Sequence, residues 1–526
     1  MTSEPASRPL LWETMAKWLW KKLKEYRYPF LSAVLFGLLA HMFAYTNKLF
    51  NHDDVWELFS KGTSISSGRW GLLFVQAVFP NFSMPWIYGI ITIVLFAVSI
   101  CMIVRILSIR NRLSQVLISG CVIVFPGLTV TTSFFFTLSS YALAFFFAVL
   151  SVWLLITTKR KRYLSFLSFL FALGCMVFSL SIFQGYLSVT TSLLVLFLIR
   201  RLLDEKDPMP VVRQGFYFLG FLILSLLIYY GFTLGLNRLL GIEFNDYAKE
   251  RITFQISDLP SDILQAYQCF VSYFTNNYHG IIPGGMSRIM HCLCLTAALI
   301  LLLIWFAVQK KGQLPRLLLL AGLVGILPLA INCMCLFVDF RSAGALISFG
   351  FTAVYLLAAM MADVCLTWIP TGKLAKIAHQ LALHAGTVSM ALIIVVNIYL
   401  ANEYYLNLYL RYENTYSFYT ALAADIQMTP GFDENTQIAV IGTYTSPEFY
   451  SNFDKINQLR GSTNLSPALY SKSRFLEYLI GYPVSFVGGQ EAQEIRNSDE
   501  FARMPVYPYY GSMKMIGDVY VVKLSD

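Results

Sequence analysis

Long apolar stretches separated by short polar ones dominate the first 401 residues of the chain. A helix that crosses the hydrocarbon core of a bilayer needs about 20 predominantly apolar residues, and by this rule we expect about eleven spanning helices. The segments are 29–46, 85–106, 113–129, 134–157, 163–180, 183–199, 214–236, 288–308, 317–338, 343–369 and 382–399. The pattern therefore predicts an all-α polytopic membrane protein.

The pattern changes near residue 402, after which no segment is long and apolar enough to span a membrane. Short apolar runs rich in β-branched residues lie at 437–443, 483–488 and 518–524 and predict strands. A helical stretch is expected at 466–480. These elements predict a small α/β domain over residues 402–526.

The remaining organisation follows from the flanks of the spanning segments. Residues 1–28 carry Trp, Leu and Lys at helical spacing from residue 12 onward, which predicts an amphipathic helix on the cytoplasmic surface. Residues 29–401 would form the transmembrane domain, with a first outer loop at 47–84 and a large outer loop at 241–287. The large loop could cover a lipid-binding groove, or it could be a structural cap.

Composition and charge agree with a membrane location. Hydrophobic residues make up 57% of the chain and charged residues only 13%, against about 25% in soluble proteins. The net charge of +9 does not indicate nucleic acid, because Lys and Arg cluster in short runs between apolar stretches. With the N-terminus inside, 22 of these residues fall on the cytoplasmic side and 8 in the outer loops, so we expect the C-terminal domain outside.

Two adjacent carboxylates, Asp53 and Asp54, follow the first predicted helix within a few residues. Their mutual repulsion at the membrane surface can raise the pKa of one of them. Either could act as a general base that deprotonates a sugar hydroxyl. The alternative is a solvated N-cap of a surface helix that begins near Val55.

The same loop continues as Ser-Gly-Arg-Trp-Gly at residues 67–71. Arg69 is a charge-assisted donor suited to a phosphate. Trp70 could stack on a sugar or on a prenyl chain. Both residue types are also common interfacial anchors, and that alternative remains open.

Two predicted outer turns carry further candidates. Gln184 and Tyr186 lie in the tight turn between the fifth and sixth predicted helices, where they could bind a sugar or simply pack a helical hairpin. Asp339 and Arg341 lie in the turn after the ninth predicted helix, between two strongly apolar segments. They could form a local ion pair, or Arg341 could contact a phosphate.

Aromatic residues recur at the start of the C-terminal region at spacings of four and three. They fall on one helical face, and packing or an aromatic belt is a better explanation for them than a sugar-stacking platform. They are Tyr405, Tyr409, Tyr412, Tyr416 and Tyr419.

The sequence holds no HExxH motif, no phosphate loop and no glycine fingerprint for a dinucleotide. An enzyme whose candidate groups all face outward needs an activated substrate on that side, and lipid-phosphate sugars meet this need.

The segment 51–76, NHDDVWELFSKGTSISSGRWGLLFVQ, resembles bacterial serotype-converting glucosyltransferases that modify O-antigen. The turn FQGY at 183–186 and the layout of many helices with an outer C-terminal segment are similar too. The resemblance covers roughly residues 29–402. Such enzymes belong to the GT-C superfamily, so the resemblance implies a GT-C-like fold in the bacterial cytoplasmic membrane. It also implies transfer of a sugar, with glucose the expected one, from undecaprenyl phosphate to a surface glycan.

The resemblance also implies roles for individual residues. The first outer loop would carry the essential carboxylate, so Asp53 or Asp54 would be the general base. Arg69 and Arg341 would hold the donor phosphate, and Gln184 would orient a sugar. The C-terminal domain lies outside the resemblance, and it could select the acceptor. No metal or other cofactor is required, although His52 with the two aspartates could form a metal site.

Other functions remain open on the sequence alone. A flippase or transporter of lipid-linked glycans would need polar or charged residues buried along a path through the membrane, and the predicted helices are almost free of charged residues in mid-span. A ligase or polymerase would bind a polyprenyl pyrophosphate, which the sequence does not exclude. In a non-enzymatic assembly protein, the outer Asp, Arg and Gln residues would be accidental.

Overall fold

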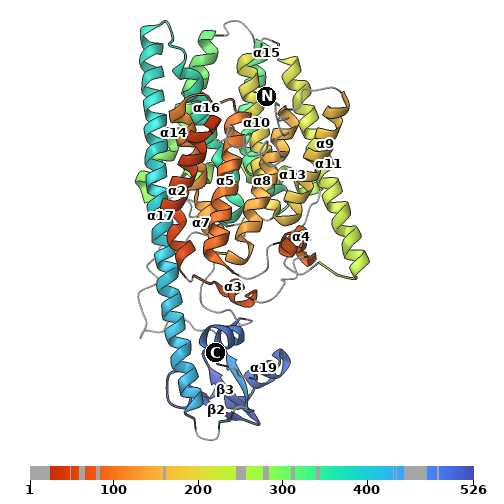
Figure 1. The fold of residues 1–526 in the computed structure, drawn as a ribbon, viewed down its shortest axis with the longest axis vertical. Helices are drawn as coiled ribbons and strands as arrows, with labels where there is room; N and C mark the ends of the chain where they lie inside the picture. The colour runs from red at the N-terminus through yellow and green to blue at the C-terminus, as the bar shows by residue number, and fades with distance from the viewer. Residues whose placement is uncertain are drawn as a thin grey trace, which may run out of the picture.

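A bundle of long apolar helices forms most of the molecule, and a small domain lies at one end of it (Figure 1). Ten helices among the described residues are long and apolar enough to span a membrane, and a helix pair bent by 42° makes an eleventh if it is counted as one span. The predicted all-α polytopic fold is therefore confirmed. The computed structural model describes residues 24–47, 49–58, 65–78, 83–157, 162–205, 207–244, 256–275, 284–309, 314–338, 344–429, 432–433, 435–442, 471–482 and 485–525.

The spanning elements follow the predicted segments closely. They are α2 (Arg27–Thr46), α5 (Pro85–Ile106), α8 (Phe135–Thr157), α9 (Arg162–Ile182), η2 with α10 (Gln184–Tyr186 and Leu187–Asp204), α11 (Met209–Leu240), α14 (Gly284–Gln309), α15 (Leu314–Ile331), η6 with α16 (Ala345–Phe351 and Thr352–Leu366) and α17 (Lys373–Gln427). The bent pair is α6 (Arg112–Ile123) and α7 (Pro126–Thr132). Pro126 at the start of α7 has no N–H to continue the helix, which explains the break.

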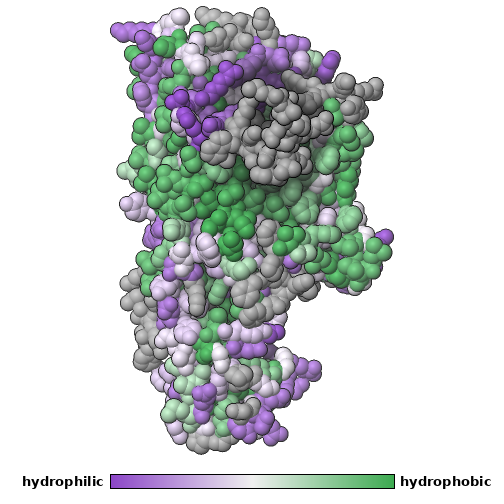
Figure 2. All heavy atoms as spheres, viewed as in Figure 1, coloured by the Kyte–Doolittle hydropathy of each residue, from purple (hydrophilic) through white to green (hydrophobic). Residues whose placement is uncertain are grey.

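The helices differ in how much of their surface is covered. In the span formed by η6 and α16, 89% of the most apolar segment is buried inside the protein, whereas in α11 the buried share is 17%. Apart from Arg213 and Arg238 near its two ends, the exposed positions of α11 are apolar or aromatic residues and glycines, and Figure 2 shows a hydrophobic belt across the visible face of the bundle. Apolar side chains on such an outer surface are suited to contact with lipid rather than with water.

The 55-residue helix α17 crosses the bundle and continues into the small domain (Figure 1). At 1.5 Å per residue it is about 80 Å long, more than twice the thickness of a hydrocarbon core. Its tyrosine face packs against other aromatic rings along most of its length, which confirms the packing interpretation; Tyr416 is the most exposed of the five. The ring pairs are Tyr405–His41, Tyr409–Phe43, Tyr412–Phe50 and Tyr419–Phe475.

The small domain is built on a three-stranded sheet in the order β1-β3-β2. The central strand β3 (Val519–Lys523) is buried along its whole length; β1 (Gln437–Ile441) pairs with it in parallel and β2 (Met513–Ile516) antiparallel. Around the sheet lie α18 (Lys472–Arg474), the π-helical turn η9 (Phe475–Ile480), α19 (Gly489–Arg496) and α20 (Asp499–Ala502).

Two of the three predicted strands coincide with β1 and β3. Of the third, 483–488, the described part contributes one bridge, in which Phe486 pairs with Ile438. Strand β2 was not predicted, because its four-residue sequence MKMI holds only one β-branched residue, Ile516, and no aromatic residue. The predicted helix at 466–480 is helical over the part that is described, from Lys472 to Ile480.

We call the end of the bundle next to this domain the domain side. Three short elements lie there, namely α3 (His52–Trp56), η1 (Ile65–Ser67) and α4 (Gly71–Val78). The predicted amphipathic helix at residues 1–28 lies outside the described residues except for its last turn, which leads into α2.

The predicted large loop 241–287 contains η3 (Ile256–Asp258) and the helix α13 (Leu259–Thr275). This helix is tied to the bundle: the Tyr273 hydroxyl bonds that of Tyr355 at 2.8 Å, and the Tyr267 hydroxyl donates to the Gly325 carbonyl at 2.8 Å. It also packs on η4 (Cys333–Leu336). The described part of the loop is therefore packed on the bundle as a structural cap would be, and a role in covering a lipid-binding groove stays a prediction.

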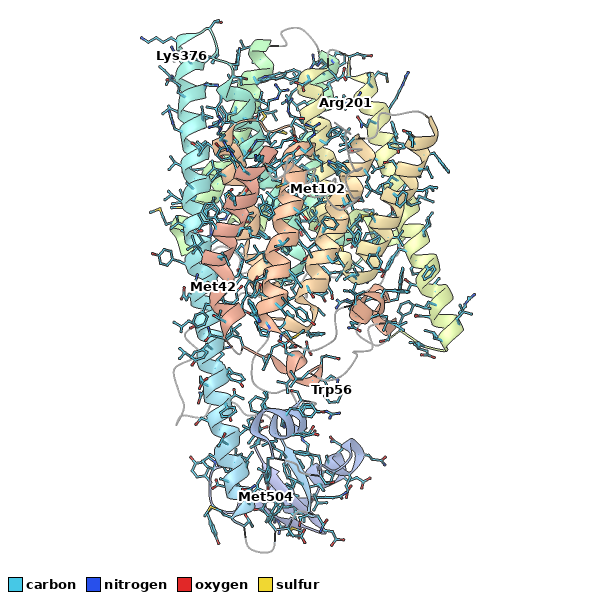
Figure 3. The ribbon with its side chains drawn as sticks, viewed as in Figure 1. Met42, Trp56, Met102, Arg201, Lys376 and Met504 are labelled. Carbon is cyan, nitrogen blue, oxygen red and sulfur yellow. The ribbon has the colours of Figure 1, made fainter. Side chains whose placement is uncertain are left out.

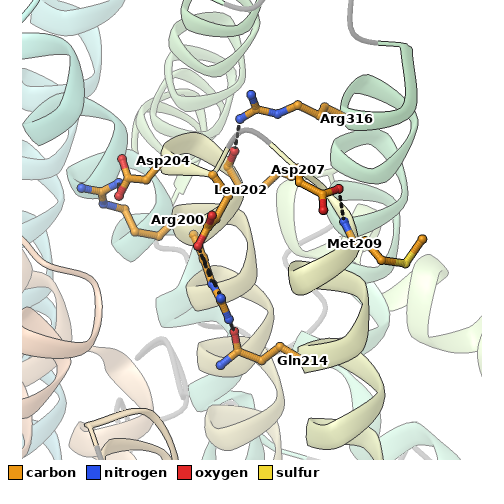
Figure 4. Close-up of polar contacts among 9 residues, drawn as sticks. Arg200, Leu202, Asp204, Asp207, Met209, Gln214 and Arg316 are labelled. Atoms are coloured by element: carbon orange, nitrogen blue, oxygen red, sulfur yellow. Dashed lines mark hydrogen bonds and ion pairs between the residues drawn. The ribbon is translucent and has the colours of Figure 1, made fainter. Parts of the chain in front are cut away.

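The opposite end of the bundle is held by charged side chains that bond across helices (Figure 4). Arg316 of α15 is buried and donates to the Leu202 carbonyl of α10 at 2.5 Å. Arg201 of α10 bonds the side chain of Gln214 in α11. These contacts join three helices at the end away from the small domain.

Candidate functional site

The residues around Asp53 and Asp54 form a capping box at the start of α3. The Asn51 side chain accepts a hydrogen bond from the Asp54 N–H at 2.8 Å, and the Asp54 Oδ2 atom accepts one from the Asn51 N–H at 3.3 Å. Because a five-residue helix is not stable in isolation, such caps are what hold it. A surface helix was one of the two expectations for this segment. It begins at His52 rather than Val55, and its N-cap is Asn51.

The Asp54 carboxylate anchors α3 to the start of α8. Its Oδ1 atom accepts a hydrogen bond from the Phe136 N–H at 2.8 Å and one from the Ser83 hydroxyl at 3.5 Å. The first N–H groups of a helix have no partner within it, so a carboxylate there is favourable. The Asn51 side chain adds a second link, because its amide group donates a hydrogen bond to the Ser133 carbonyl.

The two aspartates differ sharply in their surroundings. The Asp54 side chain is fully buried, whereas Asp53 is partly exposed. Burial raises the pKa of Asp54 to about 7, opposed by the backbone N–H groups of Phe136 and Asn51 and assisted by the neighbouring charge of Asp53. The Asp54 carboxylate is thus enclosed by the protein and hydrogen-bonded to it. Of the two carboxylates, Asp53 is the one that is accessible to a ligand.

The segment before Arg69 is locked between η2 and α11. Tyr229 of α11 donates to the Gly68 carbonyl at 3.0 Å, and Gln184 of η2 donates to the Tyr229 hydroxyl at 2.7 Å. Gln184 also donates to the Ser67 carbonyl at 3.4 Å. Gln184 and the Arg69 loop, which are 115 positions apart in the sequence, are therefore part of one polar cluster.

Trp70 is a buried anchor of this loop. Its indole N–H donates to the Thr233 hydroxyl at 3.1 Å, and its ring lies 4.7 Å from that of Phe232, both in α11. Tyr186 is fully buried too, against the rings of Phe183 and Phe349. These positions fit the anchoring and packing interpretations, and sugar binding by either residue stays a prediction.

The Arg69 guanidinium lies against the aromatic rings of α8 and the turn before η2. It donates to the Tyr141 hydroxyl at 3.0 Å and lies 5.6 Å from the centroid of the Phe183 ring. Tyr141 follows Phe136, the partner of Asp54, by five residues, or about 7 to 8 Å along α8. The buried carboxylate and the guanidinium are thus attached to the same end of the same helix.

Most of the predicted site residues lie on the domain side, in two groups: Asp53 and Asp54 on α3, and Arg69, Trp70 and Gln184 between η2 and α11. Arg341 lies outside the described residues. The residues that sequence reasoning missed are Tyr141, Tyr229 and Thr233, which lie inside apolar helices. The four-residue spacing of Tyr229 and Thr233 puts both on one face of α11, and this polar stripe was the signal that could have revealed them.

We expect Gly68→Ala to destabilise the protein more than Gly241→Ala. Both glycines have positive φ, 73° and 63°, so alanine adds strain of about 1–2 kcal/mol at each. A Cβ at Gly68 would also lie 2.7 Å from the Tyr229 hydroxyl, whereas one at Gly241 meets nothing within 4 Å. This steric overlap should lower the free energy of unfolding of the Gly68→Ala variant by about 1–3 kcal/mol more. Thermal unfolding of the two variants tests this, and equal losses would contradict it.

The expectation that no metal is needed stays a prediction. Within the described part of the chain, no three His, Cys, Asp or Glu side chains gather as a metal site would require. The side chain of His52 is not among those described.

The comparisons with known proteins bear on the same region of the chain. The model of a family described as glucosyl transferase GtrII matches residues 42–362. The match covers more than half of the chain, runs from α2 to α16, and includes α3, the Arg69 loop and η2. No curated protein and no solved structure matches the chain.

Proposed function

The chain belongs to the glucosyl transferase GtrII family, and from this premise we propose that it moves glucose from a polyprenyl-phosphate carrier to a cell-surface glycan. The transfer would take place on the outer face of the bacterial cytoplasmic membrane. Family membership supports a glycosyltransferase, and the spanning helices support a multi-pass membrane protein. The observation that supports the rest is that α3 and the Arg69 loop are both bonded to the domain-side end of α8, through Asp54 and Arg69, while Gln184 bonds the same loop.

The distribution of positive charge supports placing the domain side outside. Cytoplasmic ends of membrane proteins are rich in Lys and Arg. Figure 3 labels Arg201 and Lys376 at the end of the bundle away from the domain, and Trp56 at the domain side. Described basic residues at the end away from the domain are Lys24, Arg27, Arg105, Arg110, Arg112, Arg200, Arg201, Arg213, Arg316, Lys373 and Lys376.

A lipid-linked donor fits a site at this position. Nucleotide sugars are cytoplasmic, so an outward-facing site needs a sugar that has already crossed the membrane. A polyprenyl phosphate keeps its chain in the hydrocarbon core and its phosphate near the headgroups. Arg69, bonded to Tyr141 at the domain-side end of α8, is a cation at that depth. Its guanidinium is well suited to a phosphate.

The chemistry follows from the placement of the side chains. Asp53 takes the proton of an acceptor hydroxyl, whose oxygen attacks the anomeric carbon of glucose. The bond between that carbon and the phosphate oxygen breaks, and its electrons leave with the polyprenyl phosphate. Arg69 stabilises the charge that develops on this leaving group. Asp54 is a positioning residue, because it fixes α3 on α8.

Gln184 is suited to orient the sugar. Its Nε2 group donates to Tyr229 and to the Ser67 carbonyl, which fixes the amide plane. The Oε1 atom is then the part of the side chain that can accept a hydrogen bond from a sugar hydroxyl.

The test is a transfer assay with purified protein, radiolabelled polyprenyl-phosphate glucose and extracted surface polysaccharide. We expect the wild type to label the polysaccharide. Arg69→Ala should raise the KM for the donor about 10- to 100-fold, because a hydrogen bond to a charged group contributes about 1.5–3 kcal/mol. The acceptor KM should stay unchanged.

Arg238→Ala is the matched control, since Arg238 is an exposed arginine at the domain-side end of α11. It should keep both KM values. A wild type that transfers no label would overturn the proposed function. An Arg69→Ala variant with an unchanged donor KM would overturn the phosphate role of Arg69.

A further inference from the structure

The small domain meets the candidate site at α3. The turn η9 packs against α3, and the Arg474 guanidinium lies over the indole ring of Trp56 at 5.5 Å from its centroid. Trp56 lies between the bundle and the domain in Figure 3. A residue of the domain, 418 positions away in the sequence, is thus in contact with the helix that carries Asp53 and Asp54.

Aromatic packing fixes this juxtaposition. The ring of Tyr412 in α17 lies 6.4 Å from that of Phe50, which immediately precedes Asn51. It also lies 6.5 Å from that of Phe475, which follows Arg474. One side chain of the long helix therefore touches both segments. A second ring, Tyr419, adds a contact with Phe475 at 5.2 Å.

The cluster combines exposed aromatic and charged groups. Trp56 is 41% exposed, and the Arg474 and Glu477 side chains are 39% and 46% exposed. Arg474 bonds Glu477 at 3.4 Å and also the Tyr478 hydroxyl. Glu477 and Tyr478 lie in the π-helical turn η9, which Arg474 precedes as the N-cap, and π-helical elements are rare and frequent at functional sites.

The position of Trp56 on α3 determines which carboxylate a ligand bound at this cluster would lie beside. Asp53 and Trp56 are three residues apart in a helix, so their side chains are neighbours on its surface. Asp54 points instead into the protein, toward Phe136 and Ser83. A ligand on the indole would therefore lie beside the partly exposed carboxylate and not the buried one.

We propose that Trp56, Arg474, Glu477 and Tyr478 form the subsite that holds the acceptor glycan. A pyranose ring packs its C–H face on an aromatic side chain, and its hydroxyls bond charged side chains such as those of Arg474 and Glu477. A sugar held there presents a hydroxyl to Asp53. The C-terminal domain thus completes the active site from the side opposite the lipid-borne donor, and this assignment rests on the proposed transfer reaction.

The experiment measures the KM for extracted surface polysaccharide and the KM for polyprenyl-phosphate glucose in the full-length protein. Trp56→Ala should raise the acceptor KM about tenfold, the equivalent of about 1.4 kcal/mol. Glu477→Gln, which keeps the size of an exposed side chain, should raise it severalfold. Neither change should alter the donor KM. A structural role alone would lower the thermal unfolding midpoint without this separation of the two constants.

Matched controls are available on the same domain. Tyr510→Ala removes an aromatic ring that is fully exposed, and Glu491→Gln removes an exposed carboxylate of α19. Both controls should keep both KM values. An active wild type whose Trp56 and Glu477 variants retain the acceptor KM would overturn this proposal alone. A wild type with no transfer would overturn the proposed function and this proposal with it.

Discussion

Replacing Asp53 with Asn is expected to reduce glucosyl transfer by a factor of about 10² to 10⁴, the usual contribution of a general base. The amide has the size of the carboxylate but cannot accept the proton of the acceptor hydroxyl. Asp53 lies at the partly exposed surface of α3, whereas the carboxylate that holds the helix in place is that of Asp54. The loss should therefore appear in kcat, with the protein still folded.

The measurement is the initial rate of transfer at saturating donor and acceptor, together with the thermal unfolding midpoint. Glu57→Gln is the control, because it removes another carboxylate from the end of the same short helix. It should keep the rate within about twofold, far from the loss expected of a general base. If Asp53→Asn retained the wild-type rate, Asp53 would not be the base.

The second large effect concerns stability against pH. The pKa of Asp54 is raised to about 7 in the folded protein, from an ordinary value of 3.8. The folded state therefore binds a proton more tightly than the unfolded state does. The resulting stabilisation is fully present below the unfolded pKa and is lost as pH rises through about 7. Raising the pH from 5 to 9 should therefore lower the free energy of unfolding of the wild type by about 3 kcal/mol through this group.

Asp54→Asn removes this titration, so its unfolding midpoint should vary less with pH than that of the wild type. At pH 5 the variant should be the less stable protein, because an amide NH₂ group cannot accept hydrogen bonds at both positions that the carboxyl oxygens occupy. At pH 9 the difference should shrink or reverse. Midpoints measured across this range, with Glu57→Gln as the control, test the prediction. Parallel curves for the wild type and Asp54→Asn would contradict it.

The loop carrying Asp53 and Arg69 shows how far sequence reasoning reaches. The sequence indicates this loop as a candidate site because few carboxylates and arginines lie beside the apolar helices. A charge placed there costs free energy, so its presence points to a function. Which aspartate is buried could not be predicted, since the burial of Asp54 depends on the Phe136 N–H, 82 positions later. The anchoring of Trp70 depends in the same way on Thr233, a residue near the end of a predicted span.

The sequence by itself determined the spanning helices and two strands of the small domain, because length and apolarity are local properties that the bilayer and the sheet impose on each segment separately. Only the tertiary structure decided that η9 lies on α3, that α13 is tied to the bundle and that Asp54 is enclosed. Each of these depends on contacts between segments far apart in the chain, and composition and periodicity carry no information about which segments meet.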